Sequence, residues 1–163
     1  MRHAPRILGI VLGLGLIAAA CGSDTTPAGG NGGDTAGGTA TVNEASSDLG
    51  TILTDDQGLT LYVFLQDNAT QSACVDACAS TWPALTVQGD ASAGDGVDAS
   101  KLRTLERSDG AVQVTYGGHP LYHYSGDAAP GDINGQGIGN LWFVISPDGQ
   151  AVKKSASGGG YKY

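Results

Sequence analysis

The sequence has few basic residues, little sulfur and no long apolar run. Its 163 residues contain 8 lysines and arginines against 16 aspartates and glutamates, three cysteines and one methionine, the initiating Met1. Contacts to phosphate require a surface rich in lysine and arginine, so the composition argues against nucleic acid and against electrostatic attraction to anionic lipid. Without an internal methionine, the chain also lacks the thioether that serves as an axial ligand of haem or copper.

The longest apolar segment covers residues 7–20 and directly follows the basic start MRHAPR. A membrane-spanning helix needs about 20 apolar residues, so this segment is typical of an export signal. Small residues at 18–20 lead into Cys21, as in bacterial lipoprotein signals, in which the cysteine is acylated and becomes the new N-terminus. The sequence therefore predicts a signal peptide at 1–20 and a lipid on Cys21, with an ordinary secretory signal as the alternative.

The composition after the signal predicts a tethered domain. Residues 21–47 are rich in glycine, threonine and serine and hold hardly any large apolar side chain, which is typical of a flexible tether. We expect one domain at 48–154 and a flexible tail at 155–163. Loss of Arg2 and Arg6 with the signal leaves six basic against 16 acidic residues, a formal net charge of about −10. The acyl chains on Cys21 would then hold the protein on the extracytoplasmic side of a bacterial membrane.

The chain repeats itself at an offset of 60 residues. LYVFLQD at 61–67 and LYHYSGD at 121–127 share leucine, tyrosine and aspartate, and the same offset superimposes both tryptophans. Such identity without a gap predicts two copies of one structural unit, at about 50–90 and 110–150. The matched positions are Gly50 and Gly110, Gly58 and Gly118, Leu61 and Leu121, Tyr62 and Tyr122, Asp67 and Asp127, Ala69 and Ala129, Trp82 and Trp142, and Gly89 and Gly149.

The local pattern predicts a mainly β domain of the α+β type. Runs rich in valine, leucine, tyrosine and threonine are bounded by glycine, which favours about eight short strands in antiparallel hairpins. Asp109-Gly110 and Asp148-Gly149 mark two of the turns. One alanine-rich segment, residues 72–82, lacks the strand period, so we expect a short helix there that carries a C-x3-C pair and stops at Pro83.

The repeated phrase predicts a strand covered on both faces. Alternation along LYVFL places Tyr62 and Phe64 on one face and Leu61 and Val63 on the other, and both sets are apolar. Large aromatic side chains on strands usually belong to a core, so we expect a structural role for them and for Tyr122 and its neighbours.

Two aspartates follow the repeated strands, and one histidine departs from the repeat. Asp67 and Asp127 can accept backbone N–H bonds and fix the turn after each strand. His123 stands where the first unit has Val63, so its ring needs polar partners or has a separate task.

The cysteines and histidines offer the remaining candidates for chemistry. Cys74 and Cys78 form an even pair in an exported domain, which predicts a disulfide, although a regular helix is a poor frame for one at this spacing. A metal or thiol redox site is the alternative use of this pair. His119 and His123 could converge on a metal, but two histidines without a third ligand make an incomplete zinc or copper site.

Several motifs together resemble a known family. LYVFLQD, LYHYSGD, CVDACASTWPAL and GNLWFVISPDG are similar, in this order, to bacterial predicted lipoproteins with a Y-x-[FWY]-x-x-D motif, described as a secreted repeat of unknown function. The likeness covers about residues 50–149. The family motif falls on Tyr62, Phe64 and Asp67, and again on Tyr122, Tyr124 and Asp127, and also includes Cys74, Cys78, Trp82 and Pro83. The resemblance implies no assigned activity.

The sequence thus favours a lipid-anchored envelope protein with a non-catalytic domain that binds a partner or small ligand. No recognisable nucleophile elbow, phosphate loop or zinc-binding helix is present, so we expect neither an enzyme nor a resident cofactor. An alternative function is a redox module, or one handling metal or haem, built on His119 and His123 or on the cysteine pair. A cell-wall hydrolase would need paired carboxylates, for which Asp67 and Asp127 are the pair that the repeat relates.

Overall fold

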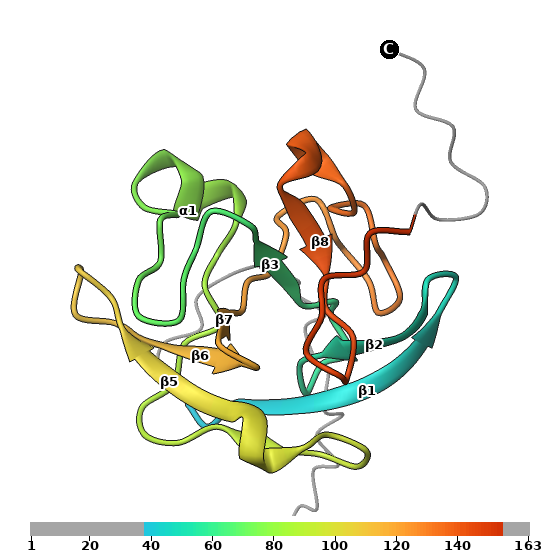
Figure 1. The fold of residues 1–163 in the computed structure, drawn as a ribbon, viewed down its shortest axis with the longest axis horizontal. Helices are drawn as coiled ribbons and strands as arrows, with labels where there is room; N and C mark the ends of the chain where they lie inside the picture. The colour runs from blue at the N-terminus through green and yellow to red at the C-terminus, as the bar shows by residue number, and fades with distance from the viewer. Residues whose placement is uncertain (1–37, 155–163) are drawn as a thin grey trace, which may run out of the picture. The chain divides into compact units, whose positions relative to one another are not determined.

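A computed structural model describes residues 38–154 (Figure 1). The predicted signal, Cys21 and the tail from 155 lie outside these residues. Along the described chain the elements are β1 (Thr41–Ser47), β2 (Gly50–Thr54), β3 (Tyr62–Phe64), α1 (Ala77–Thr81), β4 (Ser92–Ala93), the 3₁₀ helix η1 (Ala99–Lys101), β5 (Leu102–Glu106), β6 (Val112–Tyr116), β7 (His119–Pro120), the 3₁₀ helix η2 (Ile138–Asn140) and β8 (Trp142–Val144). The mainly β prediction with one short helix is confirmed.

Each unit opens with a β-hairpin. β1 pairs with β2 and β5 pairs with β6, both antiparallel, and the second hairpin follows the first by about 60 residues with its register shifted by one residue. Gly50 and Gly110 both have positive φ, at 105° and 83°, which glycine adopts without strain. β6 continues into β7 through Gly117 and Gly118, and the turn expected at Asp148-Gly149 is closed by a bond from the N–H of Gly149 to the carbonyl of Ser146.

The repeated strands pair across the two units. β3 of the first unit lies antiparallel to β8 of the second unit, with Val63 opposite Phe143. Conversely, the segment around Leu121 in the second unit bonds to residues 83–85 of the first, where the N–H of Leu85 donates to the carbonyl of Leu121 at 2.9 Å. The matching bond, from Ile145 to Leu61, measures 3.3 Å. The two copies are therefore interleaved.

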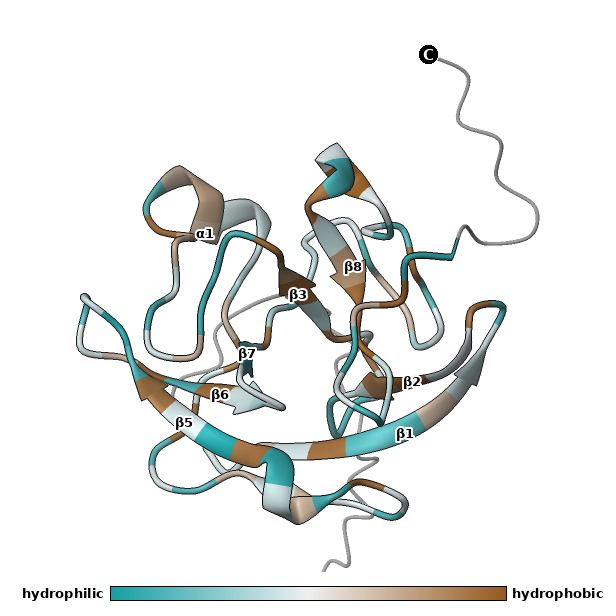
Figure 2. Ribbon diagram, viewed as in Figure 1, coloured by the Kyte–Doolittle hydropathy of each residue, from teal (hydrophilic) through white to brown (hydrophobic). Residues whose placement is uncertain are grey.

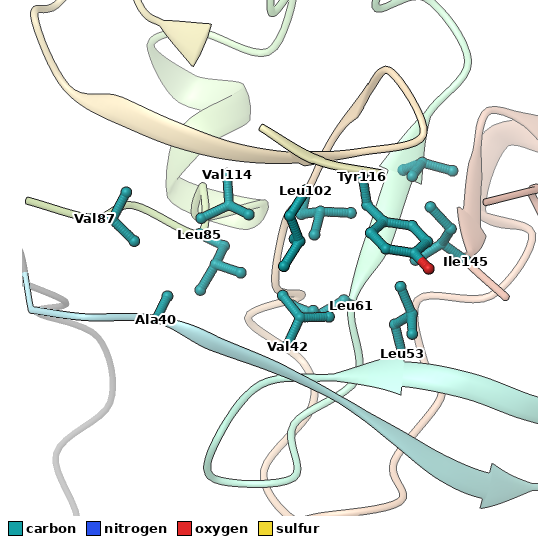
Figure 3. Close-up of a cluster of buried hydrophobic side chains, with 12 residues drawn as sticks. Ala40, Val42, Leu53, Leu61, Leu85, Val87, Leu102, Val114, Tyr116 and Ile145 are labelled. Atoms are coloured by element: carbon teal, nitrogen blue, oxygen red, sulfur yellow. The ribbon is translucent and has the colours of Figure 1, made fainter. Parts of the chain in front are cut away.

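Two hydrophobic cores lie on opposite faces of these strands. Leu61 and Val63 enter the first core, whose side chains converge in Figure 3, while Tyr62 and Phe64 enter the second. The alternation predicted for LYVFL is confirmed, and Figure 2 shows β3 in largely hydrophobic colours, whereas β5 carries both hydrophobic and hydrophilic ones. The first core contains Ala40, Val42, Leu53, Leu61, Val63, Leu85, Val87, Leu102, Val114, Tyr116, Leu121 and Ile145.

The domain starts earlier than the sequence predicted. β1 begins at Thr41, within the segment 21–47 that was expected to be a tether. Its sequence TVNEASS is mostly polar because one side of the strand is exposed, and Val42 alone among its residues is fully buried. Pairing with β2 supplies hydrogen bonds that the composition of β1 does not reveal.

The helix is shorter than predicted. α1 spans Ala77–Thr81, not 72–82, so it contains Cys78 but not Cys74. Asp76, the residue before the helix, has φ of 52° and ψ of −122°, a non-helical conformation that ends any continuous helix there. The residues before it are held instead by side-chain bonds, since Arg107 donates to the carbonyl of Cys74 at 2.7 Å.

Candidate binding site

The tyrosine of each repeat bonds to the aspartate of the other repeat. Tyr62 donates its hydroxyl hydrogen to Asp127 Oδ2 at 2.6 Å, and Tyr122 donates to Asp67 Oδ2 at 2.6 Å. Their backbones exchange bonds as well, from the N–H of Tyr62 to the carbonyl of Tyr122 at 2.8 Å and back at 3.0 Å. The two motif residues that define the repeat thus join the two units.

The aspartates also hold the loops that follow the strands. Asp67 Oδ1 accepts the N–H of Ala73 at 2.7 Å, and Asp127 Oδ1 accepts the N–H of Asn134 at 3.0 Å. One carboxylate therefore fixes a turn and a tyrosine at once. The predicted turn-fixing role agrees with this geometry, but the partner tyrosine was not predicted.

The tyrosine pairs perturb ionisation in one direction. Burial, followed by the hydrogen bond to Asp127 and its charge, raises the pKa of Tyr62 well above 10. Burial and the bond to Asp67 raise the pKa of Tyr122 as well. The pKa values of Asp67 and Asp127 are also raised by burial, which outweighs the lowering by their tyrosine donors. Each tyrosine therefore keeps its proton and serves as a hydrogen-bond donor.

Both tryptophans stack at the centre of the second core. The rings of Trp82 and Trp142 are parallel within 1° with centroids 3.9 Å apart. Phe64 stacks on Trp142 at 4.3 Å, and Tyr124 lies against Trp82 at 4.5 Å. These four rings form one stack, and the motif residues Tyr62 and Tyr122 meet it edge-on at Trp82 and Trp142.

The two ends of this symmetric arrangement differ in what supports the tyrosine oxygen. At Tyr62 the donor is the N–H of Gly135, at 3.2 Å. At Tyr122 it is the hydroxyl of Ser72, at 2.7 Å, which in turn accepts from Arg107 Nη1 at 2.7 Å. The hydroxyl of Tyr62 is thus supported by a backbone group, whereas the hydroxyl of Tyr122 belongs to a chain of hydrogen-bonded polar side chains.

Arg107 is the centre of the second end. Its side chain is only 4% exposed, and it donates to Gln113 Oε1 at 2.6 Å and to the carbonyl of Cys74 at 2.7 Å, besides Ser72. Its Nε lies 3.4 Å from Asp109 Oδ2. A buried guanidinium needs such partners to offset its lost hydration. The arginine thereby fastens the loop that holds the cysteines to β6.

Cys74 and Cys78 form a disulfide with a Cα–Cα distance of 5.2 Å. Because Cys74 lies before the helix, the bond joins a loop residue to the first turn of α1, which resolves the geometric difficulty of the spacing. Cys74 is fully buried against the aromatic stack. The disulfide prediction agrees with this structure.

A cleft of about 300 Å³ opens beside this network. Its walls are residues 70–73 and 75 of the cysteine loop and residues 106–108 at the end of β5. Ser72 and Arg107 reach both the cleft and the tyrosine chain, and Val75 exposes 41% of its surface at the cleft. This cleft is the candidate binding site.

The histidines do not come together as a metal site. His123 Nε2 lies 3.0 Å from Asp55 Oδ2, so its partner is a carboxylate that is only 6% exposed. His119 lies on β7 opposite Tyr116. Within residues 38–154, no group of three or more histidine, cysteine, aspartate or glutamate side chains could hold a metal ion.

The pair between His123 and Asp55 explains why the repeat breaks at this position. Burial alone would raise the pKa of Asp55. The hydrogen bonds from His123, Leu59 and Gln57 and the charge of the histidine together lower it by more, so the net pKa lies below its ordinary value. The polar partner that His123 requires is therefore present, and it comes from the other unit.

Sequence reasoning missed Arg107, Ser72 and Asp55. Arg107 directly precedes the turn sequence SDG, and a charged side chain beside a turn is expected to be exposed to solvent. The sequence held one signal for Arg107. Lysine and arginine are few and carboxylates are many in this chain, so each basic residue has several possible acidic partners.

Fold and site together define a small β domain with two cross-bonded units and a disulfide-held loop. The family model described as a secreted repeat of unknown function matches residues 44–86 and 103–146. These segments make up more than half of the chain and coincide with the two units, so the protein belongs to this family of secreted repeats. No curated protein and no solved structure matches the chain at a significant level. Among the described residues, no helix has the length and apolar character that crossing a bilayer requires.

Proposed function

We propose that the protein is a lipid-anchored envelope protein whose domain binds a partner without catalysing a reaction. One observation carries the proposal: the groups that could do chemistry bond to one another, while a cleft stays open beside them. Tyr62 and Tyr122 are held as donors to the two aspartates, and the cysteines are joined. Within residues 38–154, every buried side-chain nitrogen and oxygen has a hydrogen-bond partner.

The anchor is the part of the proposal that rests on sequence. Cys21 after small residues would carry the acyl chains, and the segment up to β1 would let the domain reach away from the membrane. The acidic domain has no electrostatic attraction to anionic lipid, so the acyl chains would supply the whole of the membrane affinity.

Two measurements test the proposal. Cells expressing the full chain are labelled with a palmitate analogue and fractionated, with Cys21→Ser as the matched variant. We expect label and membrane association in the first protein and neither in the second. The purified full chain in detergent is then tested for binding to envelope proteins extracted from cells from which this protein has been deleted. Absence of the label would refute the anchor, and absence of saturable binding would refute the binding function.

A further inference from the structure

β5 leaves part of its outer edge open. It is the outer strand of the sheet ordered β5-β6-β7. The N–H of Arg107 donates to the carbonyl of Ala111 at 2.8 Å. The backbone N–H and carbonyl groups of odd-numbered residues of β5 therefore point toward β6, and those of even-numbered residues point away from it. Within residues 38–154, no hydrogen bond uses the backbone N–H or carbonyl of Thr104 or Glu106, and both residues are exposed.

The equivalent strand of the first unit has an extended segment on its outer edge. β4 lies parallel to β1, and the N–H of Ser92 donates to the carbonyl of Ala40 at 2.8 Å. The next bond runs from Gly94 to Val42 at 2.7 Å. In the second unit the chain directly before β5 forms the 3₁₀ helix η1, so the extended edge of β5 that stays open runs from Thr104 onward. The fold therefore already pairs this kind of edge with a parallel strand.

The open edge leads into the cleft. Glu106 is the last residue of β5 and also a wall of the cleft, and residues 107 and 108 continue that wall. A segment paired in parallel with Thr104 and Glu106 would therefore extend its C-terminal residues into the cleft. Main-chain bonds would give affinity, and the side chain in the cleft would give specificity.

The charges around the cleft select a cationic side chain. Arg107 is buried and already bonded to four partners, so its charge is compensated within the protein. Glu106 is exposed at the wall, and the exposed residue Asp76 directly follows the lining residue Val75 in the sequence. Complementary charge would favour lysine or arginine in this position.

We propose that the edge of β5 and the adjoining cleft bind an extended segment of a partner protein, parallel to β5, with a lysine or arginine side chain beside Glu106. This inference rests on the proposed binding function and names its partner chemistry. The exposed β-branched and acidic residues along the edge suit a β-forming basic peptide.

The test uses the full chain in detergent and two labelled peptides, TVTVKS and TVTVES, measured by fluorescence anisotropy. We expect the lysine peptide to bind at least about tenfold more tightly than the glutamate peptide, because the wall is acidic. Glu106→Gln should weaken the lysine peptide about two- to fivefold, which is the range of a partly exposed ion pair. Thr104→Pro should weaken it about fivefold or more, since it removes an edge N–H.

Ser46→Pro is the control, because Ser46 is an exposed residue of β1, a strand that the proposed site does not include. It should leave peptide binding unchanged. Equal affinity of the two peptides, no binding at about 1 mM, or full binding by folded Thr104→Pro would overturn the inference. If circular dichroism shows that Thr104→Pro is unfolded, a lysine peptide with N-methyl groups at alternate residues replaces it, and undiminished binding overturns the inference. Saturable envelope binding that survives both variants would leave the proposed function intact and reject this site.

Discussion

The cross-bonded tyrosines make a prediction that a self-contained repeat would not. Tyr62→Phe removes the donor to Asp127 Oδ2 and leaves a half-buried carboxylate with one partner fewer. A hydrogen bond to a charged group contributes about 1.5–3 kcal/mol, so we expect a loss of about 2 kcal/mol in the free energy of unfolding. Tyr122→Phe should cost a similar amount through Asp67. Domains of this size have about 5–15 kcal/mol in total, so each variant should remain folded.

Double-mutant cycles decide which aspartate each tyrosine uses. Urea unfolding followed by tryptophan fluorescence gives the free energies for Tyr62→Phe combined with Asp127→Ala and with Asp67→Ala. We expect a coupling of about 1–3 kcal/mol for the cross-unit pair Tyr62 and Asp127, and less than about 0.5 kcal/mol for the pair within one unit. A larger coupling within the unit than between units would refute the interleaved structure.

Three further outcomes follow from contacts of the described residues. Gly135→Ala should destabilise the domain by about 1–3 kcal/mol in urea unfolding, because an added Cβ would lie 2.8 Å from the rings of Trp82 and Tyr62. Replacing Cys74 and Cys78 together by serine should cost about 2 kcal/mol, the entropy of a closed loop this short, measured as a lower denaturant midpoint. His123→Val should cost about 1–3 kcal/mol at neutral pH, since Asp55 loses its partner. The folded-state pKa of Asp55 is lowered, so its stabilisation is present above the ordinary value of 3.8 and is lost as the pH falls further; the difference between wild type and variant should shrink in that range.

Each of these three predictions has a control variant or a result that would contradict it. Gly38→Ala adds a Cβ that meets no atom within 4 Å, so it should leave stability unchanged, and an equal loss in both glycine variants would contradict the steric explanation. Reductant should lower the stability of wild type but not of the double serine variant. A gain in stability in His123→Val would show that the histidine is a burden on the fold.

The sequence predicted the repeat and its strand faces, but not the partners of the motif residues. An offset of 60 residues shows that Tyr62 corresponds to Tyr122 and Asp67 to Asp127. It cannot distinguish contacts within a copy from contacts between copies, because both arrangements give the same alignment. Alternation placed Leu61 and Val63 opposite Tyr62 correctly, since burial on both faces is visible in the apolar pattern.

Strand β1 and the hydrogen bonds of Arg107 could not be predicted from the local sequence pattern. The composition of β1 is typical of a polar tether. The strand is stabilised by pairing with β2, and local composition gives no information on such pairing. Arg107 and Ser72 meet across 35 positions of the chain. Such long-range polar contacts depend on the assembled fold, so neither residue carries a signal in its own neighbourhood.

Because tyrosine and aspartate are exchanged between the units, neither unit is complete by itself. A single copy would have a tyrosine without its acceptor and an aspartate without its donor, and half of the tryptophan stack. Two separate copies, however, could make the tyrosine–aspartate bond twice and the tryptophan stack once across a twofold axis. The domain is thus arranged like a homodimer whose two protomers are joined in one polypeptide. Because a single chain supplies both halves, they need not be identical, and the disulfide and Arg107 occur on one side of the axis only.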